Sequence, residues 1–116
     1  MIPVSELLDG AADYMEKYGK TEYQYRNVKT GAVCAIGAMR GYIAERLGMR
    51  FELVGEYHPE TVLCMIAVGE YLKINPHLPE LQPNDCDMIT WSDNSTQETV
   101  VQTFRDVAIK QREDAM

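Results

Sequence analysis

The strongest constraint on the fold of this chain is a row of small side chains in the segment 33–47. Cys34, Gly37, Ala38 and Gly41 recur at intervals of three and four residues, so they share one face of a helix. Each glycine inside a helix costs about 1 kcal/mol relative to alanine. We expect a contact that offsets this cost, and the close approach of another backbone is the simplest one. The segment is therefore predicted to be the central, most tightly packed helix.

Three other segments carry apolar side chains at the spacing that is typical of amphipathic helices. These segments are about 5–18, 59–72 and 96–110. Gly19 follows the first of them, where a left-handed C-terminal cap is expected. Pro59 suits the first turn of the second. Ser95 and Glu98 have the spacing of a capping box at the start of the last.

These patterns predict an all-α fold, a compact bundle of four main helices with irregular connectors. A chain of 116 residues, 46% of them hydrophobic, is within the size of one domain, so residues 1–116 are predicted to form a single helical domain. The patterns do not assign a conformation to the connectors 49–58 and 75–90.

The charge and the cysteines limit the environment and the partners. The 18 acids outnumber the 11 bases, and a net charge of −7 argues against binding to nucleic acid or anionic lipid. Three cysteines, no C-x-x-C motif and no secretory signal predict reduced thiols in a cytoplasm. The longest apolar run, 62–69, is too short to span a bilayer. We expect a soluble, cytoplasmic protein.

No sequence motif indicates a cofactor or a metal. The chain has no P-loop, no dinucleotide-binding glycine fingerprint, no H-E-x-x-H and no cluster of Cys and His at metal-ligand spacing. Three scattered cysteines and two histidines form a zinc site only if the fold happens to gather them. Neither a cofactor nor a metal is predicted.

The sharpest enzymatic hypothesis is a thiol hydrolase that uses Cys34. This residue comes at the start of a predicted helix, where the helix dipole lowers the pKa of a thiol. His58 or His77 follows, and then Asp93 or Asn94, which is the order of the catalytic groups, Cys then His then Asn or Asp, in papain-like enzymes. Triads are recognised by geometry rather than by order. The alternative is a buried structural cysteine, because Cys34 also belongs to the small-residue row.

Two groups of apolar side chains are candidates for a protein interface. The segment 59–72 is apolar around much of its circumference, which indicates either full burial or a second face that packs on another chain. The tyrosines of the irregular stretch 20–31 belong to the second group. The candidate interface residues are Val62, Met65, Ile66, Tyr71, Tyr23 and Tyr25. A homodimer through 59–72 is one expectation from this pattern.

Two short segments carry a resemblance to a known family. The segment 34–38 reads C-A-I-G-A and resembles the "C-A-L-G-A" signature of small uncharacterised proteins from actinobacteria and their phages. Trp91-Ser92-Asp93, followed by Glu98 and Val100, resembles the "W-N-D" and "E-x-V" segments at the end of those proteins. The chain departs from the pattern at Ser92, where the family usually has Asn. The resemblance implies a phage or actinobacterial accessory protein and implies no activity.

The leading functional hypothesis is a non-enzymatic interaction module that binds a host protein or self-assembles. The chain lacks a recognisable catalytic set, and its seven Met and seven Tyr suit adaptable contact surfaces. The first alternative is the hydrolase that uses Cys34. The second is an acidic mimic of DNA, which needs rows of acids, whereas the acids of this chain are interrupted by bases.

Overall fold

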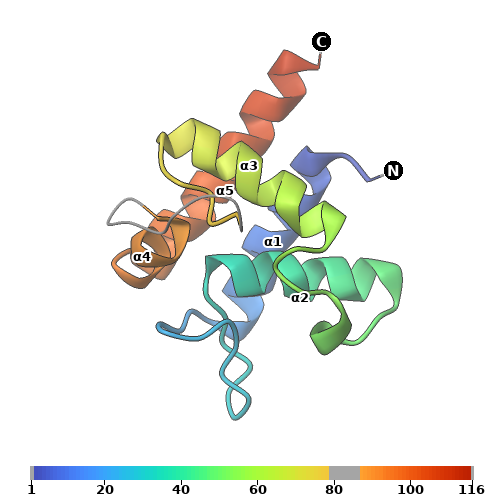
Figure 1. Cartoon of the computed structure of the whole chain (residues 1–116), viewed down its shortest axis with the longest axis vertical. Coiled ribbons are helices and arrows are strands. Elements are labelled where there is room, and N and C mark those ends of the chain that lie inside the picture. Colours follow the sequence, from blue (N-terminus) through green and yellow to red (C-terminus); the bar gives the residue numbers. More distant parts are fainter. Residues whose placement is uncertain (1, 79–86, 116) are drawn as a thin grey trace.

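The computed structural model describes residues 2–78 and 87–115, and within these ranges the chain is helical and forms no β-strand (Figure 1). The elements are α1 (Val4–Tyr18), α2 (Ala35–Leu47), the 3₁₀ helix η1 (Phe51–Leu53), α3 (Pro59–Leu72), α4 (Met88–Asp93) and α5 (Gln97–Asp114). The all-α prediction is confirmed. The sequence patterns did not predict α4, which begins near the end of the connector 75–90 and continues to Asp93. They also ended the last helix at 110, four residues before its observed end.

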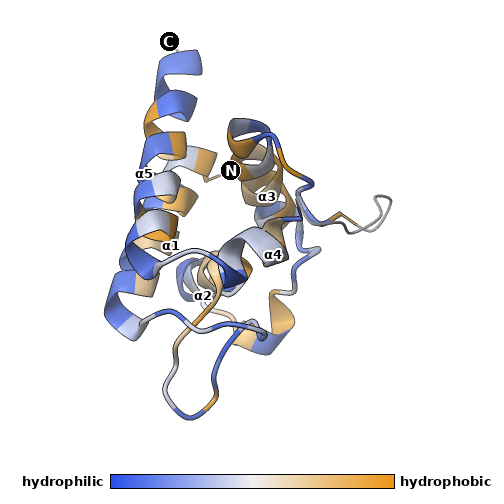
Figure 2. Cartoon of the chain, turned by 90° about the vertical axis from the view of Figure 1, so that its left-hand side faces the viewer, coloured by the Kyte–Doolittle hydropathy of each residue, from blue (hydrophilic) through white to orange (hydrophobic). Residues whose placement is uncertain are grey.

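Helices α1 and α2 hold the bundle together. Helix α1 packs along α5 and also contacts α2 and α3, whereas α2 contacts α1, α3, α4 and η1. In Figure 1, α2 lies across α1. Figure 2 shows hydrophobic residues on the sides of α1, α3 and α5 that face one another, and hydrophilic residues on the outer side of α5. No helix in the described part of the chain has the length and the apolar character needed to cross a membrane.

The small residues of α2 make room for two different neighbours. A Cβ atom on Gly37 would lie 1.8 Å from the carbonyl oxygen of Tyr25, so another backbone does approach here, as predicted. A Cβ atom on Gly41 would lie 2.4 Å from the ring of Tyr14, so at this position the neighbour is an aromatic ring. The ring of Tyr42 fills the same kind of space over Gly10 of α1. Helices α1 and α2 thus interlock through two reciprocal pairs of glycine and tyrosine.

The helix ends agree with the sequence patterns in part. Pro59 occupies the first turn of α3, as predicted. Gly19 ends α1 with a φ of +91°, but its ψ of 171° is extended rather than left-handed helical. The prediction that Ser95 caps α5 is wrong by one residue, because the cap is Thr96. Its Oγ1 accepts a hydrogen bond from the Thr99 N–H at 3.1 Å. Ser95 Oγ instead donates to the Trp91 carbonyl at 2.6 Å and closes the end of α4.

Three acids of α1, Asp9, Asp13 and Glu16, form ion pairs with arginines of α5. Arg105 Nη2 donates to Asp13 Oδ1 at 2.9 Å and also pairs with Glu16. Arg112 pairs with Asp9. These side chains lie at the surface, alongside the buried contact between the two helices. These ion pairs link α1 to α5, so the three acids do not form an unpaired acidic face.

Candidate functional site

A pocket of about 390 Å³ lies between the segment after α1, the N-terminus of α2, and α4. Its lining is mostly apolar and consists of Tyr23, Gln24, Tyr25, Cys34, Ile89 and Asp93. The volume is within the range of small-ligand sites. Four of the residues that the sequence singled out meet here: Cys34, Asp93, Tyr23 and Tyr25. Ile89 and Gln24 complete the wall, and neither was among the candidate site residues that the sequence singled out.

The wall that carries the tyrosines is a looped segment held by backbone hydrogen bonds to Val33 and Cys34. Thr21 N–H donates to the Val33 carbonyl at 3.0 Å, and Val33 N–H donates to the Gly19 carbonyl at 3.0 Å. Cys34 N–H donates to the Tyr25 carbonyl at 3.2 Å. This is the same carbonyl that rests on Gly37. The small-residue row of α2 therefore fixes the position of the loop that forms the pocket.

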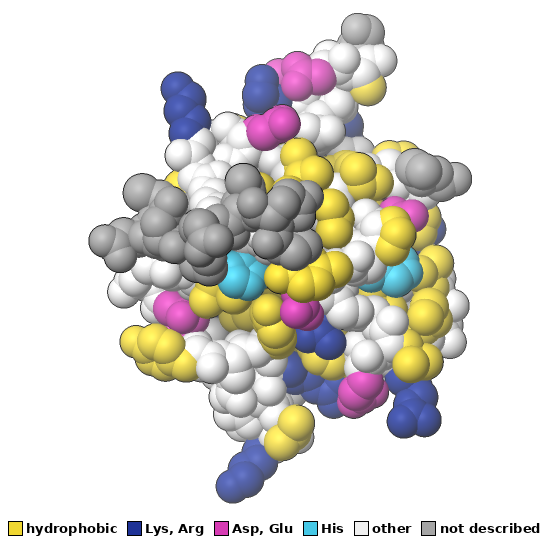
Figure 3. Space-filling view, viewed as in Figure 1, with side chains coloured by type: hydrophobic (Ala, Val, Ile, Leu, Met, Phe, Trp, Pro, Cys, Tyr) yellow, Lys and Arg dark blue, Asp and Glu magenta, His cyan; other side chains and the backbone are white. Residues whose placement is uncertain are grey.

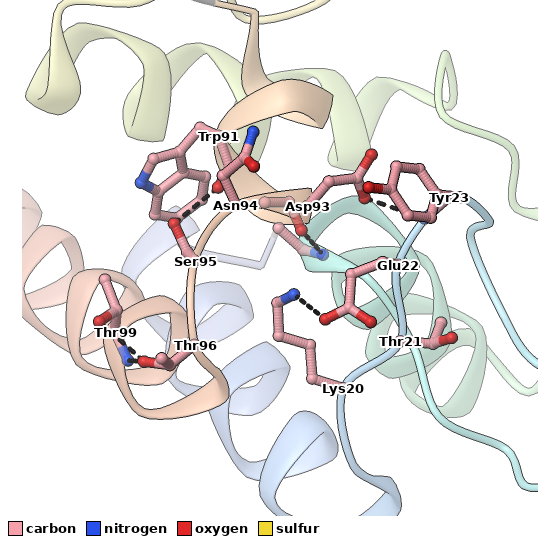
Figure 4. A network of polar contacts seen from close by, with 12 residues as sticks. Lys20, Thr21, Glu22, Tyr23, Trp91, Asp93, Asn94, Ser95, Thr96 and Thr99 are labelled. Atoms are coloured by element: carbon pink, nitrogen blue, oxygen red, sulfur yellow. Dashed lines mark hydrogen bonds and ion pairs between the residues drawn. The ribbon is translucent and has the colours of Figure 1, made fainter.

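Helix α4 is bound to both of the other walls through its last two residues. Ser92 Oγ accepts a hydrogen bond from the Ala35 N–H at 2.9 Å, in a buried position at the start of α2. Asp93 Oδ1 accepts one from the Tyr23 N–H at 3.0 Å (Figure 4). In the segment that reads W-S-D, the serine and the aspartate thus join α4 to the rest of the site.

Tyr23 has an unusual backbone and an unusually exposed side chain. Its φ is +64°, in the left-handed region that non-glycine residues rarely adopt, and its side chain is 87% exposed. The hydrogen bond from its N–H to Asp93 helps to hold this conformation. The result is an aromatic ring presented to solvent beside an apolar pocket.

Cys34 does not have the properties of a catalytic thiol. Its side chain is 4% exposed, and its Sγ caps α2 by accepting a hydrogen bond from the Gly37 N–H at 3.4 Å. Burial raises the pKa of the thiol, and the nearby Asp93 carboxylate adds to this, against the lowering by backbone N–H groups. The predicted lowering at the helix start is wrong, because desolvation outweighs the effect of the helix end.

Neither histidine lines the pocket. His58 caps α3, and its Nδ1 accepts a hydrogen bond from the Glu60 N–H at 3.2 Å. His77 Nδ1 lies 2.8 Å from Asp87 Oδ2, next to the start of α4. The fold therefore brings Cys34 and Asp93 to one pocket, whereas both histidines lie elsewhere. Among residues 2–78 and 87–115, no group of His, Cys, Asp and Glu is placed to hold a metal ion.

The candidate interface on α3 is only partly available to a partner. Met65 is completely buried in the core, so it is no part of an interface. Val62 and Ile66 are half-buried, and Tyr71 is 41% exposed. Figure 3 shows hydrophobic side chains gathered over α3 on the face toward the viewer. The prediction that this helix is apolar nearly all round agrees with a buried side and a partly exposed outer side.

One buried charge was missed by sequence reasoning. Arg40 is only 8% exposed, although it carries a guanidinium. Its Nε donates to the Val54 carbonyl at 2.6 Å, and its guanidinium lies over the rings of Phe51, at 4.2 Å, and Tyr25, at 5.0 Å. The available signal was its position in the middle of the small-residue helix, where its immediate neighbours are Met39 and Gly41.

The comparison with protein families identifies the chain. The model of DUF6197, a family of unknown function, matches residues 1–110, and the chain belongs to this family. No curated protein and no solved structure matches the chain.

Proposed function

We propose that this member of the DUF6197 family is a non-enzymatic binding protein that engages a protein partner at the pocket beside Tyr23. The observation that carries the proposal is Tyr23 itself, an 87% exposed aromatic side chain on a left-handed backbone beside a mostly apolar pocket. Such a backbone costs about 1 kcal/mol or more, and exposed tyrosines next to apolar pockets are typical of interface hot spots. Binding of a partner protein explains why the fold holds an exposed aromatic ring on a strained backbone.

The resemblance of the C-A-I-G-A and W-S-D segments supports an origin in an actinobacterium or one of its phages. On this proposal the partner is a host protein in the cytoplasm, where the three cysteines stay reduced. The partner anchors an apolar side chain in the pocket, between Ile89 and the two tyrosines.

Two observations favour binding over the alternatives. Cys34 is buried, its pKa is raised by burial, and no histidine lines the pocket, which argues against a thiol hydrolase. Three acids of α1, Asp9, Asp13 and Glu16, are paired with arginines of α5, which argues against an acidic mimic of DNA.

The experiment is an affinity capture from an actinobacterial lysate with three tagged baits: the wild type, Y23N and Y71A. Asn tolerates the left-handed backbone of Tyr23, so Y23N removes the ring without adding strain. We expect one protein to be enriched by the wild type and by Y71A, and about tenfold less by Y23N, as for the loss of an interface hot spot. Equal recovery by Y23N, with its fold verified by circular dichroism, would contradict the proposal.

A second candidate function is self-association through the outer side of α3. The observation that favours it is the exposure of Leu63 and Tyr71 beside the half-buried Val62 and Ile66. Light scattering over a range of protein concentrations tests it. A dimer that the L63E variant converts to a monomer supports this candidate, and a wild type that stays monomeric at high concentration rejects it.

A further inference from the structure

Arg40 is a buried cation with no carboxylate partner in the part of the chain that the structure describes. Its Nε is bound to the Val54 carbonyl, and its Nη2 reaches the Phe51 carbonyl only at 3.5 Å. Within the described residues, no Asp or Glu pairs with Arg40, and its Nη1 makes no hydrogen bond. Removing a charge from water is costly, and the ring faces of Phe51 and Tyr25 offset only part of that cost. Among the described side chains, the buried polar atoms without a partner are Glu60 Oε2 and Thr61 Oγ1, so the unpaired Nη1 of Arg40 is open to solvent and to a ligand.

A second arginine faces the same space. Arg26 lies over the Phe51 ring at 4.9 Å and, like Arg40, has no carboxylate partner among the described residues. Both arginines line a cavity of about 360 Å³, with walls of Tyr25, Val28, Phe51 and Glu52. Glu52 is the one acidic member of that lining, so two guanidinium groups stand against one carboxylate.

Other arginines of the chain show what is unusual here. Arg46 pairs with Glu6, Arg105 with Asp13 and Glu16, and Arg112 with Asp9. Arg50 is exposed. Arg40 has neither full exposure nor a carboxylate partner within residues 2–78 and 87–115.

We propose that the cavity between Arg26 and Arg40 binds a small ligand that carries a carboxylate or a phosphate group. The planar guanidinium presents parallel N–H donors that match the oxygens of either group. The apolar body of the ligand packs against Val28 and the tyrosine ring. This site is distinct from the pocket beside Tyr23, although Tyr25 lines both, and it does not depend on the proposed protein partner.

The test is an NMR titration of the full ¹⁵N-labelled chain with phenyl phosphate and, separately, with benzoate. Benzamide, which has the same ring and no charge, is the neutral control. We expect at least one of the two anions to give saturable shifts at the Arg40 Nε–H and at the amides of residues 25–28 and 51–54. Benzamide is expected to give none. A shift with one anion alone identifies the acidic group that the site prefers.

Two substitutions test the charges in opposite directions. R26Q removes one guanidinium and, because Arg26 makes no hydrogen bond in the described structure, leaves the fold intact. We expect R26Q to weaken anion binding about fivefold or more and E52Q, which removes the opposing charge, to strengthen it about twofold. K110Q and E113Q on the distant end of α5 are the charge-matched controls and should leave binding unchanged (Figure 1).

Three results would overturn the proposal. The first is the absence of localised shifts with both anions up to about 10 mM, where even weak specific sites are occupied. The second is equal binding of benzamide. The third is anion binding that R26Q and E52Q leave unchanged.

Discussion

Gly37 is the residue whose replacement tests the packing most sharply. A Cβ atom there meets the Tyr25 carbonyl at 1.8 Å, and a backbone atom cannot move aside as a flexible side chain does. We expect G37A to lower the free energy of unfolding by about 3 kcal/mol, measured by urea denaturation. G55A is the matched control: no atom lies within 4 Å of the new Cβ and no positive φ opposes it. It should change the stability by less than about 1 kcal/mol. A G37A protein as stable as G55A would contradict the packing.

The two described cysteines are predicted to react slowly. Burial raises the pKa of Cys34, and it raises the pKa of Cys64 to about 12. At pH 8 the native C86S variant should therefore react with a disulfide reagent far more slowly than the same chain in denaturant. Fast labelling of Cys34 in the native protein would revive the hydrolase hypothesis.

The same shift has a consequence for stability at high pH. The folded pKa of Cys64 lies above the ordinary value of 9.0, so the neutral thiol is favoured by folding. The contribution of the neutral Cys64 thiol to the free energy of unfolding is complete below pH 9, and it is lost as the pH rises from 9 toward 12. The free energy of unfolding of the wild type should thus fall more steeply over this range than that of C64A.

The residue-level predictions from sequence were right about packing and wrong about charge. The spacing of Gly37 indicated a close neighbour without identifying it, because spacing reports a helix face and not what lies on it. The predicted direction of the pKa shift of Cys34 was wrong. A sequence shows where a helix begins, but it does not show the desolvation that opposes the effect of the helix end on the thiol.

At the scale of elements, the ion pairs between α1 and α5 are the clearest target for mutation. Arg105 bridges Asp13 and Glu16, and a network of surface pairs contributes more than an isolated pair. We expect R105A to lower the free energy of unfolding by about 1 kcal/mol at low salt and by less in high salt, where the charges are screened. K110A, which removes an isolated pair with Asp114, should cost less than about 0.5 kcal/mol. Equal losses of unfolding free energy in the two variants would show that the ion pairs of Arg105 do not act as a cooperative network.

The long helices were predictable, and the short one was not. Helices α1 and α3 have apolar faces that repeat over several turns, so periodicity reveals them. Helix α4 has six residues, too few for a periodic pattern, and depends on tertiary contacts such as the bond from Ala35 to Ser92. Because the Ser95 hydroxyl is hydrogen-bonded to the Trp91 carbonyl at the end of α4, Thr96 rather than Ser95 caps α5.

At the scale of the whole molecule, the pocket depends on contacts that no local pattern encodes. Asp93 is 70 residues from Tyr23, the residue that it holds, and Ser92 is 57 residues from Ala35. The sequence marked Cys34, Asp93 and the tyrosines one by one and assigned them to a triad and to an interface. Only the fold shows that they form the walls of one pocket.

The most direct test of the binding proposal is site-specific photo-crosslinking. A photoreactive phenylalanine analogue is placed at Tyr23 in one protein and at Ile109 in another, and each is irradiated in an actinobacterial lysate. Both positions are exposed, but Ile109 lies on α5, away from the pocket. We predict one discrete adduct of the chain with a host protein from position 23 and none from position 109. No adduct from position 23, or the same adducts from both positions, would contradict the account.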